Sequence, residues 1–424
     1  MERRVVITGM GVVSPLGLTL DDFSKGLQTG VSAIERWESL GEMNYASQIC
    51  ARPPEITEEI KKKYFSDLTI KFLKHDGILN GAVAAIDAWK DAGLSMNDEE
   101  PDWDSGSVFG IGSSGIDVLI KKYVENVDAK QVRRLGSTMV EQLMNSGVSA
   151  YITGFLGLGN HVTTNSSACS TGSEAVIMGY ERIRAGMAKR MVCGGCEGYN
   201  KYSWAGFDAM RVLCRDSNDS PEKGSRPMNA SASGFVPGAG AGALVLESYE
   251  SAVERGAKIY AEILGTGLNS GGQRMGGTMT KPNIEGARRC LQMAMDSSRV
   301  HPDQIDLICG HLTSTIGDSI EVKNWAQVLS RTGKDFPPIN SLKSMIGHCL
   351  GAAGAIELVA AVVQMNQSFI HASLNSEELH PEIEEVVDRS KIPLKKIDKE
   401  IDIVAKSSFG FGDVNSCLVL RNWK

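Results

Sequence analysis

The segment from Leu350 to Met365 limits the fold more than any other part of this chain. Glu357 is its one charged residue, and Ala, Ile, Leu and Val fill most of its other positions. A helix that is apolar around its whole circumference has to be buried on most sides. The chain must therefore pack other layers around this helix, which requires a fold with a large interior.

The length of 424 residues favours a divided interior. A single hydrophobic core rarely extends beyond about 250–300 residues, so we expect two packed halves, residues 1–255 and 256–424. Strand-like and helix-like segments alternate along both, which predicts an α/β fold with a parallel sheet in each half. The longest amphipathic pattern, residues 70–92, predicts one continuous helix. A strand, a loop and a helix rich in small residues recur around Cys169 and His348, which indicates a duplicated unit.

Charge and hydropathy disfavour two classes of function. The formal net charge is −7, whereas a nucleic-acid-binding protein is expected to carry a basic excess. No apolar run reaches the roughly 18 residues of a membrane span, and the first residues pass directly into a strand rather than a signal-peptide core. We therefore expect a cytoplasmic protein with no membrane span and no nucleic-acid partner.

The nine cysteines are scattered along the chain, and we expect reduced thiols. Cys193 and Cys196 have the CxxC spacing of some metal and redox centres. No second CxxC pair and no nearby pair of histidines accompany them. We interpret them as buried residues at a strand end, and we predict no metal site.

Cys169 differs from the other cysteines in its position. It follows the β-branched segment 162–165 and precedes a helix that ends near Gly186, so it lies on a sharp turn at a helix N-terminus. The partial positive charge of a helix N-terminus favours a thiolate over a thiol. The sequence thus predicts a cysteine that is nucleophilic near neutral pH, with a buried, inert cysteine as the alternative.

Two further loops carry groups suited to acyl chemistry. His311 follows the predicted strand 305–309, and Lys343 and His348 precede the apolar helix. Open α/β sheets place their ligands at the carboxyl ends of strands. We therefore expect these side chains to gather with Cys169 in one site.

Ordered motifs along the whole chain resemble those of the elongating beta-ketoacyl-acyl-carrier-protein synthases. The matching segments are residues 4–11, 14–17, 168–172, 234–242, 311–315, 343–357 and 408–412 with Asn415. The resemblance implies a thiolase-like fold in which duplicated βα halves form a five-layer αβαβα sandwich. It implies an acyltransferase of fatty acid biosynthesis, which condenses an acyl group on Cys169 with malonyl-acyl-carrier protein. The products are beta-ketoacyl-acyl-carrier protein and CO₂.

The resemblance also implies roles for individual residues. Cys169, His311 and His348 form a catalytic triad, with Lys343 and Glu357 as supporting charges. A thiolate of Cys169 would hold the acyl group, and two neutral imidazoles would stabilise the malonyl-derived enolate. Glu357 needs a partner inside its apolar helix, and a purely structural ion pair is the alternative for it.

Further residues match groups of the family that contact substrate or partner. They are the backbone N–H groups of Cys169 and Phe411 (oxyanion hole), Thr313 and Thr315 (phosphopantetheine), Ile116 and Phe411 (apolar gate to the acyl pocket) and Arg211 (carrier-protein docking). Ile116 and Phe411 could instead be core residues. The phosphopantetheine arrives on the acyl carrier protein, so no resident cofactor is expected. A homodimer is implied, with a heterodimer containing a sister subunit as the alternative.

The chain departs from the family pattern beside the site. Leu312 replaces the usual glycine after the first histidine, and Asp413 replaces a glycine of the closing loop. These changes affect the shape and flexibility of the gate, so we interpret them as altered substrate choice with unchanged chemistry. A ketosynthase of an aryl-polyene or polyketide-like pathway is therefore the alternative to fatty acid elongation.

Three other classes of protein fit the sequence less well. An inactive chain-length-factor subunit would lack a nucleophile such as Cys169. A degradative thiolase needs a second catalytic cysteine, and Cys349 lies in a motif that matches the synthases instead. A cysteine hydrolase would release a free acid rather than a beta-keto thioester.

Overall fold

The computed structural model describes residues 2–96, 99–113 and 115–424. Ten strands form one mixed sheet. They are β1 (Val5–Val13), β4 (Ser105–Ile111), β5 (Val162–Thr163), β6 (Arg190–Glu197), β7 (Gly240–Ser248), β8 (Ala261–Ser270), β9 (Leu307–Cys309), β10 (Ile339–Asn340), β13 (Ile403–Gly410) and β14 (Val414–Asn422). Their order is β10-β9-β13-β14-β8-β1-β7-β6-β4-β5, so the antiparallel pair of β8 and β1 joins two five-stranded halves.

The two halves repeat one strand pattern. In the order β5-β4-β6-β7-β1, the first three strands run parallel and β7 is antiparallel to both of its neighbours. The order β10-β9-β13-β14-β8 has the same directions. The prediction of a parallel sheet in each half is therefore wrong for one strand of each half, β7 and β14. The reason is visible between β13 and β14, because a short turn between Gly410 and Val414 can join only antiparallel strands.

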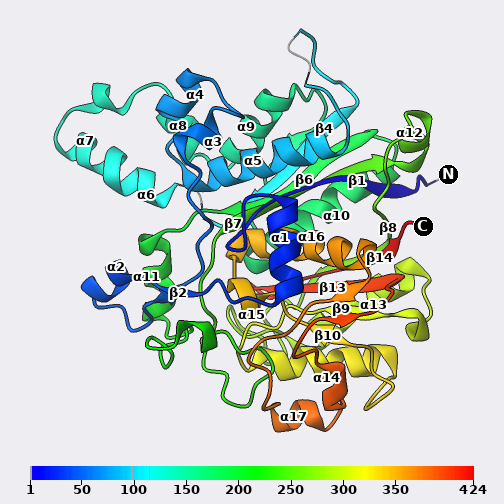
Figure 1. The fold of residues 1–424 in the computed structure, drawn as a ribbon. Helices are drawn as coiled ribbons and strands as arrows, with labels where there is room; N and C mark the ends of the chain where they lie inside the picture. The colour runs from blue at the N-terminus through cyan, green and yellow to red at the C-terminus, as the bar shows by residue number, and fades with distance from the viewer. Residues whose placement is uncertain (1, 97–98, 114) are drawn as a thin grey trace.

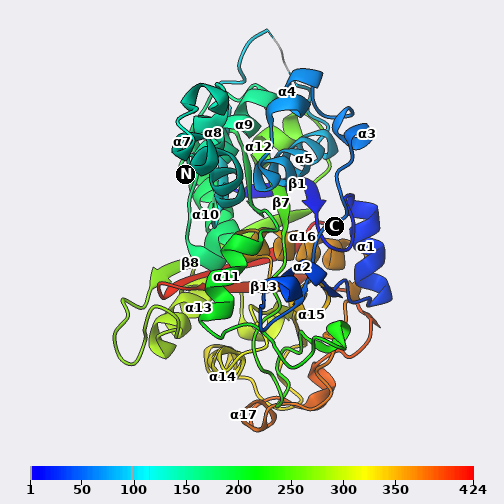
Figure 2. The same cartoon turned by 90° about the vertical axis from the view of Figure 1, so that its left-hand side faces the viewer.

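Helices cover the sheet in layers (Figures 1 and 2). The outer face of the N-terminal half carries α5 (Asp76–Asp91) and α9 (Gly147–Leu156), and that of the C-terminal half carries α13 (Ile284–Ser298) and α14 (Gly317–Leu329). Between the halves lie α10 (Thr171–Arg184) and α16 (Ala353–Asn366). This arrangement confirms the predicted α/β fold.

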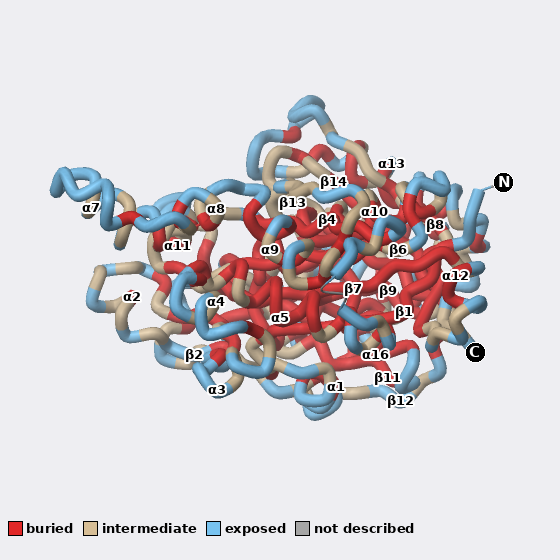
Figure 3. Tube along the Cα trace, turned by 90° about the horizontal axis from the view of Figure 1, so that it is seen from above, coloured by how far each residue is buried: buried red, intermediate tan, exposed pale blue. Residues whose placement is uncertain are grey.

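The apolar helix α16 lies in the central layer, as its composition requires. Its side chains are buried from Ala353 to Met365, and Figure 3 shows the buried segments gathered in the interior. On β7, Leu244 points toward this central layer and Val245 toward the outer helix α5, following the two-residue repeat of a strand. Both sides of the sheet are therefore covered by helices.

The predicted continuous helix 70–92 is broken in the structure. One helix, α4, spans Asp67–Phe72, and α5 begins at Asp76. His75 caps the second helix, because its Nδ1 atom accepts a hydrogen bond of 3.3 Å from the backbone N–H of Ile78. The local capping contact thus overrides the continuous amphipathic pattern.

The CxxC cysteines lie on opposite sides of β6. Cys193 packs in the central core and Cys196 in the core beneath α5. Both are free thiols, as are the other seven cysteines. Within the described residues, no helix has the length and apolar character needed to cross a membrane.

Candidate active site

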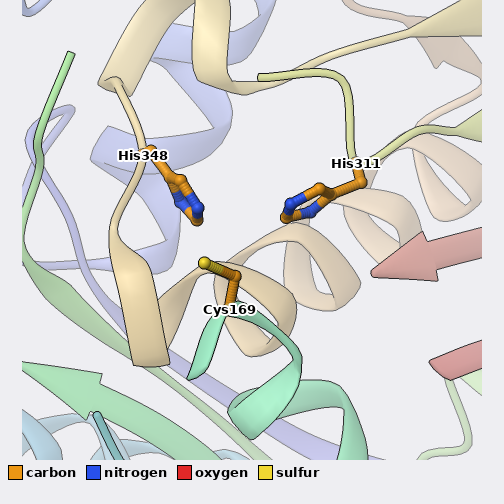
Figure 4. A group of neighbouring side chains, drawn as sticks. All are labelled: Cys169, His311 and His348. Atoms are coloured by element: carbon orange, nitrogen blue, oxygen red, sulfur yellow. The ribbon is translucent and has the colours of Figure 1, made fainter. Parts of the chain in front are cut away.

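The side chains of Cys169, His311 and His348 meet at the carboxyl ends of strands from both halves. The cysteine follows β5, and the two histidines follow β9 and β10. Figure 4 shows both imidazoles directed at the cysteine sulfur. One ligand atom from each residue lies within 4.8 Å of the others. In the part of the chain that the structure describes, this is the single such group of three or more His, Cys, Asp or Glu side chains.

A tight turn presents Cys169. Residues Ala168–Ser170 form a single 3₁₀ turn that leads directly into α10. Ala168 adopts a φ of +49°, a conformation that costs energy for a residue with a β-carbon. Thr171 holds this turn, because its hydroxyl donates to the Ala168 carbonyl at 2.6 Å and accepts the Ser167 N–H at 2.8 Å. Cys169 is partly exposed, whereas the other eight cysteines are buried.

The electrostatics of the thiol differ from the sequence-based prediction. Burial raises the pKa of Cys169 to about 11, although the Lys343 cation and a hydrogen bond from the Phe411 backbone lower it in part. The N-terminus of α10 acts in the same direction as these two groups. Desolvation outweighs them, because the thiol lies in the wall of a cavity lined largely by apolar side chains. This pKa favours the thiol at neutral pH, whereas the sequence led us to expect a thiolate.

The ring of His348 is held in one tautomer by its own backbone. Its Nδ1 atom accepts a hydrogen bond of 3.2 Å from the N–H of Leu350, so Nε2 carries the proton of the neutral ring. The glycine-rich segment 234–242 supports this residue: His348 N–H donates to the Val236 carbonyl at 2.7 Å, and Gly238 N–H donates to the His348 carbonyl at 2.8 Å. A side chain at Gly238 would contact the Ile346 carbonyl at 2.7 Å, so the close approach of these segments requires glycine.

His311 is held by two charged residues. Its backbone N–H donates to Glu321 at 2.8 Å, and the Lys343 ammonium donates to its carbonyl at 2.6 Å. The same ammonium lies 3.5 Å from the ring Nδ1. An ammonium can only donate, so this Nδ1 accepts and Nε2 carries the proton.

Both imidazoles are neutral N–H donors. Burial, followed by the Lys343 cation, lowers the pKa of His311 and of His348 well below the usual range. With both Nδ1 atoms engaged as acceptors, the Nε2–H groups are free to donate to an oxygen beside the Cys169 sulfur. Such a pair can stabilise a developing oxyanion or enolate. A metal ion would need Nε2 lone pairs, so the hydrogen-bond pattern suits an anion better than a metal.

Lys343 and Glu357 form a buried ion pair, as the position of Glu357 in an apolar helix predicts. The Lys343 ammonium hydrogen-bonds directly to His311. It also lowers the pKa of His348 through its charge. Glu357 has a second cationic partner, Lys406, whose Nζ lies 2.9 Å from Oε2.

A cavity of about 300 Å³ leads to the three residues. Thr313 and Thr315 lie in its wall with their hydroxyl oxygens 2.9 Å apart. Arg211 is exposed and adjoins the lining residue Val212. Ile116 is half-buried at the start of α6 (Ile116–Val118), outside the described residues that line this cavity.

Phe411 lines the same cavity as Cys169. Its backbone hydrogen-bonds to the cysteine. The preceding Gly410 packs against the cysteine loop so closely that a β-carbon there would lie 2.7 Å from the Ser167 carbonyl and 3.1 Å from the Cys169 nitrogen. The closing loop thus brings a backbone donor beside the sulfur.

Three charged residues near the site were not predicted from the sequence: Asp318 and Glu321 of α14 and Lys406 of β13. Asp318 accepts the backbone N–H groups of Thr313 at 2.8 Å and of Ser314 at 3.1 Å, which shapes the loop after His311. Acidic residues in a helix usually face solvent, so the sequence carries no signal for the two acids. Lys406 follows three apolar residues of a strand, and that pattern was the available clue.

The structure accommodates both residues that depart from the family pattern, Leu312 and Asp413. Leu312 has a φ of +23° and packs its side chain into the core beneath α14. Asp413 has a φ of +63°, and its buried carboxylate accepts the backbone N–H groups of Gln273 and Asn283, each at 2.9 Å. The segment 271–283 lines the cavity with residues 279–282. Asp413 therefore fixes part of the cavity wall.

Comparison with known families gives two adjacent matches. Residues 2–252 match the family model described as "Beta-ketoacyl synthase, N-terminal domain", and residues 260–377 match "Beta-ketoacyl synthase, C-terminal domain". Among curated relatives, the "3-oxoacyl-[acyl-carrier-protein] synthase 2" of Rhizobium meliloti (strain 1021) is 35% identical, with 99% of both chains covered.

Solved structures have the same fold over the whole chain. A beta-ketoacyl synthase from Burkholderia phymatum STM815 has a TM-score of 0.89 at 29% identity, with 100% of both chains covered. The complex AntDE:AntF, described as a type II PKS acyl-carrier protein with its ketosynthase bound to the hexaketide, contains a chain with a TM-score of 0.85. That chain is 27% identical, and 100% of both chains is covered.

Proposed function

The chain belongs to the beta-ketoacyl synthase family, and we propose on this basis that it condenses an acyl group held on Cys169 with malonyl-acyl-carrier protein. The reaction yields beta-ketoacyl-acyl-carrier protein and CO₂, the elongation step of fatty acid synthesis. The observation that carries the proposal is the meeting of one cysteine sulfur with two ring nitrogens within 4.8 Å. Such a site combines a nucleophile with two donors for a developing anion.

The first half-reaction transfers the acyl group. The Cys169 sulfur attacks the carbonyl of an acyl thioester, its proton passes to the departing carrier thiol, and an acyl-enzyme forms. The backbone N–H groups of Phe411 and Cys169 are placed to stabilise the tetrahedral oxyanion. Because burial raises the pKa of the thiol to about 11, we propose that it loses its proton during acyl transfer rather than before it.

The second half-reaction forms the carbon–carbon bond. The malonyl carboxylate leaves as CO₂, and its electron pair moves into an enolate of the thioester. The Nε2–H groups of His311 and His348 donate to the enolate oxygen. The enolate carbon then attacks the acyl carbonyl on Cys169, and the carbon–sulfur bond breaks to release the product and the Cys169 thiolate. Thr313 and Thr315 are placed to contact the phosphopantetheine arm.

We propose that the partner is an acyl carrier protein. One solved relative is a ketosynthase in complex with such a protein. In this chain, the exposed residues Met279, Lys281 and Ile316 line the cavity, and the exposed residues Met210 and Arg211 precede the lining residue Val212. An apolar rim flanked by cations suits a carrier protein with an acidic, partly apolar docking face.

We also propose that the protein is a homodimer. The terminal strand β5 exposes Val162, and the segment 116–144 projects from the body around α7 (Glu125–Asp128; Figure 3). This segment carries exposed apolar residues, namely Leu119, Val124, Val127, Val132, Val140 and Met144. Apolar side chains gathered on one projection favour burial against another chain. Light scattering of the purified protein distinguishes a dimer from a monomer that awaits a sister subunit.

Two further parts of this proposal concern organisation and location. The repeated strand order supports a division into halves at residues 255 and 256. The free cysteines support a reducing compartment, and hence a cytoplasmic location.

A polyketide-like pathway is the second candidate for the same chemistry. It is favoured by the altered gate residues Leu312 and Asp413 and by the likeness to a ketosynthase that carries a hexaketide. The two candidates differ in the acyl group that Cys169 accepts and in the number of extensions.

Mass spectrometry of Cys169 tests the function. Incubation with a panel of acyl-carrier thioesters is expected to add an acyl mass to the peptide that contains Cys169, and malonyl-carrier protein is then expected to remove it as a beta-keto product. The Cys169→Ala variant serves as the control and should give neither adduct nor condensation. Release of free acid, or full condensation by the Cys169→Ala variant, would contradict the assignment. The series of accepted chains separates fatty acid elongation from a polyketide-like pathway.

A further inference from the structure

Lys406 is a buried cation that the reaction described above leaves without a role. It lies within β13, four residues before the closing-loop segment that begins at Gly410, and its side chain is 0% exposed. Its neighbour Ala405 packs into the outer core beneath α14, so the alternation of the strand turns Lys406 toward the central layer. A lysine in such a position needs compensating partners.

The ammonium of Lys406 has three partners. Its Nζ donates to the Ser408 hydroxyl at 2.8 Å and to the Ser407 carbonyl. It also lies 2.9 Å from Glu357 Oε2 as an ion pair, without the alignment of a hydrogen bond to that oxygen. The other oxygen of this carboxylate pairs with Lys343. Glu357 is therefore held between two ammonium groups, with Oε1 paired to Lys343 and Oε2 paired to Lys406.

A second acid completes the charge balance. Glu321 is buried on α14, accepts the Ser407 hydroxyl at 2.6 Å, and also accepts the backbone N–H of His311. Burial raises the pKa of Glu321, and the Lys406 cation is one of the groups that oppose this rise. Two lysines and two glutamates thus form one buried network. Lys406 connects the two acids, because it pairs with Glu357 directly and bonds to Ser407, whose hydroxyl donates to Glu321.

We propose that Lys406 is a positioning residue: its ammonium anchors the Glu357 carboxylate, so that Lys343 stays directed at His311 and the Nδ1 atoms of both active-site histidines remain hydrogen-bond acceptors. The proposal rests on the function proposed above. Lys406 acts through Glu357 and Lys343, and it contacts neither Cys169 nor an imidazole directly in the described contacts.

The electrostatic consequence concerns the state of the two imidazoles. The groups that face His311 are Cys169, Glu321, Lys343, His348 and Lys406, and those that face His348 include both lysines. Lys406 is one of the cations that lower the pKa of each ring, after burial and Lys343. Loss of its charge should allow protonation at a higher pH. A proton on Nδ1 would oppose the Leu350 N–H and the Lys343 ammonium, which both donate there.

The test compares Lys406→Met with Lys406→Arg in the full-length protein. We expect Lys406→Met to lower CO₂ release from malonyl-carrier protein at pH 7 by about 10- to 100-fold, the range for groups that orient a reactive ligand. We also expect the acid limb of its pH–rate profile to move to higher pH. Acylation of Cys169 should fall much less. Lys406→Arg keeps the charge and should keep the acid limb of the wild type.

Several outcomes overturn the proposal. One is a folded Lys406→Met protein whose acid limb coincides with that of the wild type, whether or not its rate is lower. The control is Lys399→Met, which removes a partly exposed lysine 3.7 Å from Asp306 and should leave the profile unchanged.

If Lys406→Met does not fold, Lys406→Gln takes its place. If neither neutral variant folds, Lys406→Arg decides: a shifted acid limb contradicts the proposal and an unshifted one supports it. A wild-type protein that does not decarboxylate malonyl-carrier protein would instead contradict the proposed function.

Discussion

Leu350 donates its backbone N–H to Nδ1 of His348 across 3.2 Å. This contact joins the first residue of the turn before α16 to the ring that faces Cys169. It assigns the ring proton to Nε2, which is the nitrogen a substrate oxygen would meet. The backbone turn that leads into the buried helix α16 therefore also sets the tautomer of this ring.

Replacement of His348 by alanine should remove one of the two donors to the enolate oxygen. We expect CO₂ release from malonyl-carrier protein to fall by about 10²–10³-fold, the usual cost of one oxyanion donor. Acylation of Cys169 should persist, because the backbone donors at Phe411 and Cys169 remain. Parallel measurements of CO₂ release and acyl-enzyme mass check this, with the exposed His161→Ala variant as the control. Equal loss of both half-reactions would contradict the separate roles.

The reactivity of Cys169 should rise with pH well beyond neutrality. Burial raises the pKa of this thiol to about 11, so the thiolate fraction increases about tenfold per pH unit below that value. Alkylation by iodoacetamide from pH 6 to pH 10 should therefore accelerate without a plateau. Cys169→Ala gives the background from the other cysteines, which are buried. A plateau below pH 8 would show instead that the helix N-terminus outweighs desolvation.

Asp413→Gly should loosen the wall of the cavity without disturbing its own backbone, because glycine adopts the φ of +63° readily. The variant loses the acceptor for the N–H groups of Gln273 and Asn283. Hydrogen exchange at these two amides should become faster, and the range of acyl chains that Cys169 accepts should widen.

Asp413→Asn is the matched comparison for this site. Its amide oxygen can accept one of the two N–H groups, so intermediate exchange rates are expected. Unchanged exchange at Gln273 and Asn283 in the glycine variant would mean that other contacts hold the segment 271–283.

Gly242→Ala should destabilise the central layer. A β-carbon there would lie 2.5 Å from backbone atoms of Ala355 and Ile356, so β7 would have to move away from α16. We expect a loss of about 1–3 kcal/mol in the free energy of unfolding, the usual cost of overpacking. Gly206→Ala is the control, because this glycine lies in α11 (Lys201–Ala209) and a β-carbon added to it would meet no described atom within 4 Å. It should stabilise the protein by about 1 kcal/mol or less, and denaturant midpoints compare the two.

Much of the site was predictable because each part is a short, continuous motif. Cys169 at the start of a helix, His311 after a strand and His348 before the apolar helix each carry their chemistry in a few neighbouring residues. The structure places all three together. The α/β class was likewise predictable, since the alternation of strands and helices is a local pattern.

Other features depend on partners that are distant in sequence. Asp413 was recognised as unusual, but its acceptor role is set by Gln273, 140 residues earlier. Nothing near Lys406 in the sequence indicates that Glu357 lies beside it. The direction of β7 depends on the long connection that precedes it. The direction of β14 and the break before α5 depend instead on local features that were not predicted, the short turn after Gly410 and the cap at His75.

The sequence by itself thus determined which groups can react and that a nearly all-apolar helix must lie inside the fold. Periodicity and short motifs are properties of neighbouring residues, so they can be read along the chain. Only the tertiary structure decided the state of those groups: a thiol rather than a thiolate at Cys169, and neutral imidazoles with their protons on Nε2. The pKa of a buried group depends on the water it loses and on the charges and hydrogen bonds around it. Those neighbours come from both halves of the chain, and folding alone brings them together.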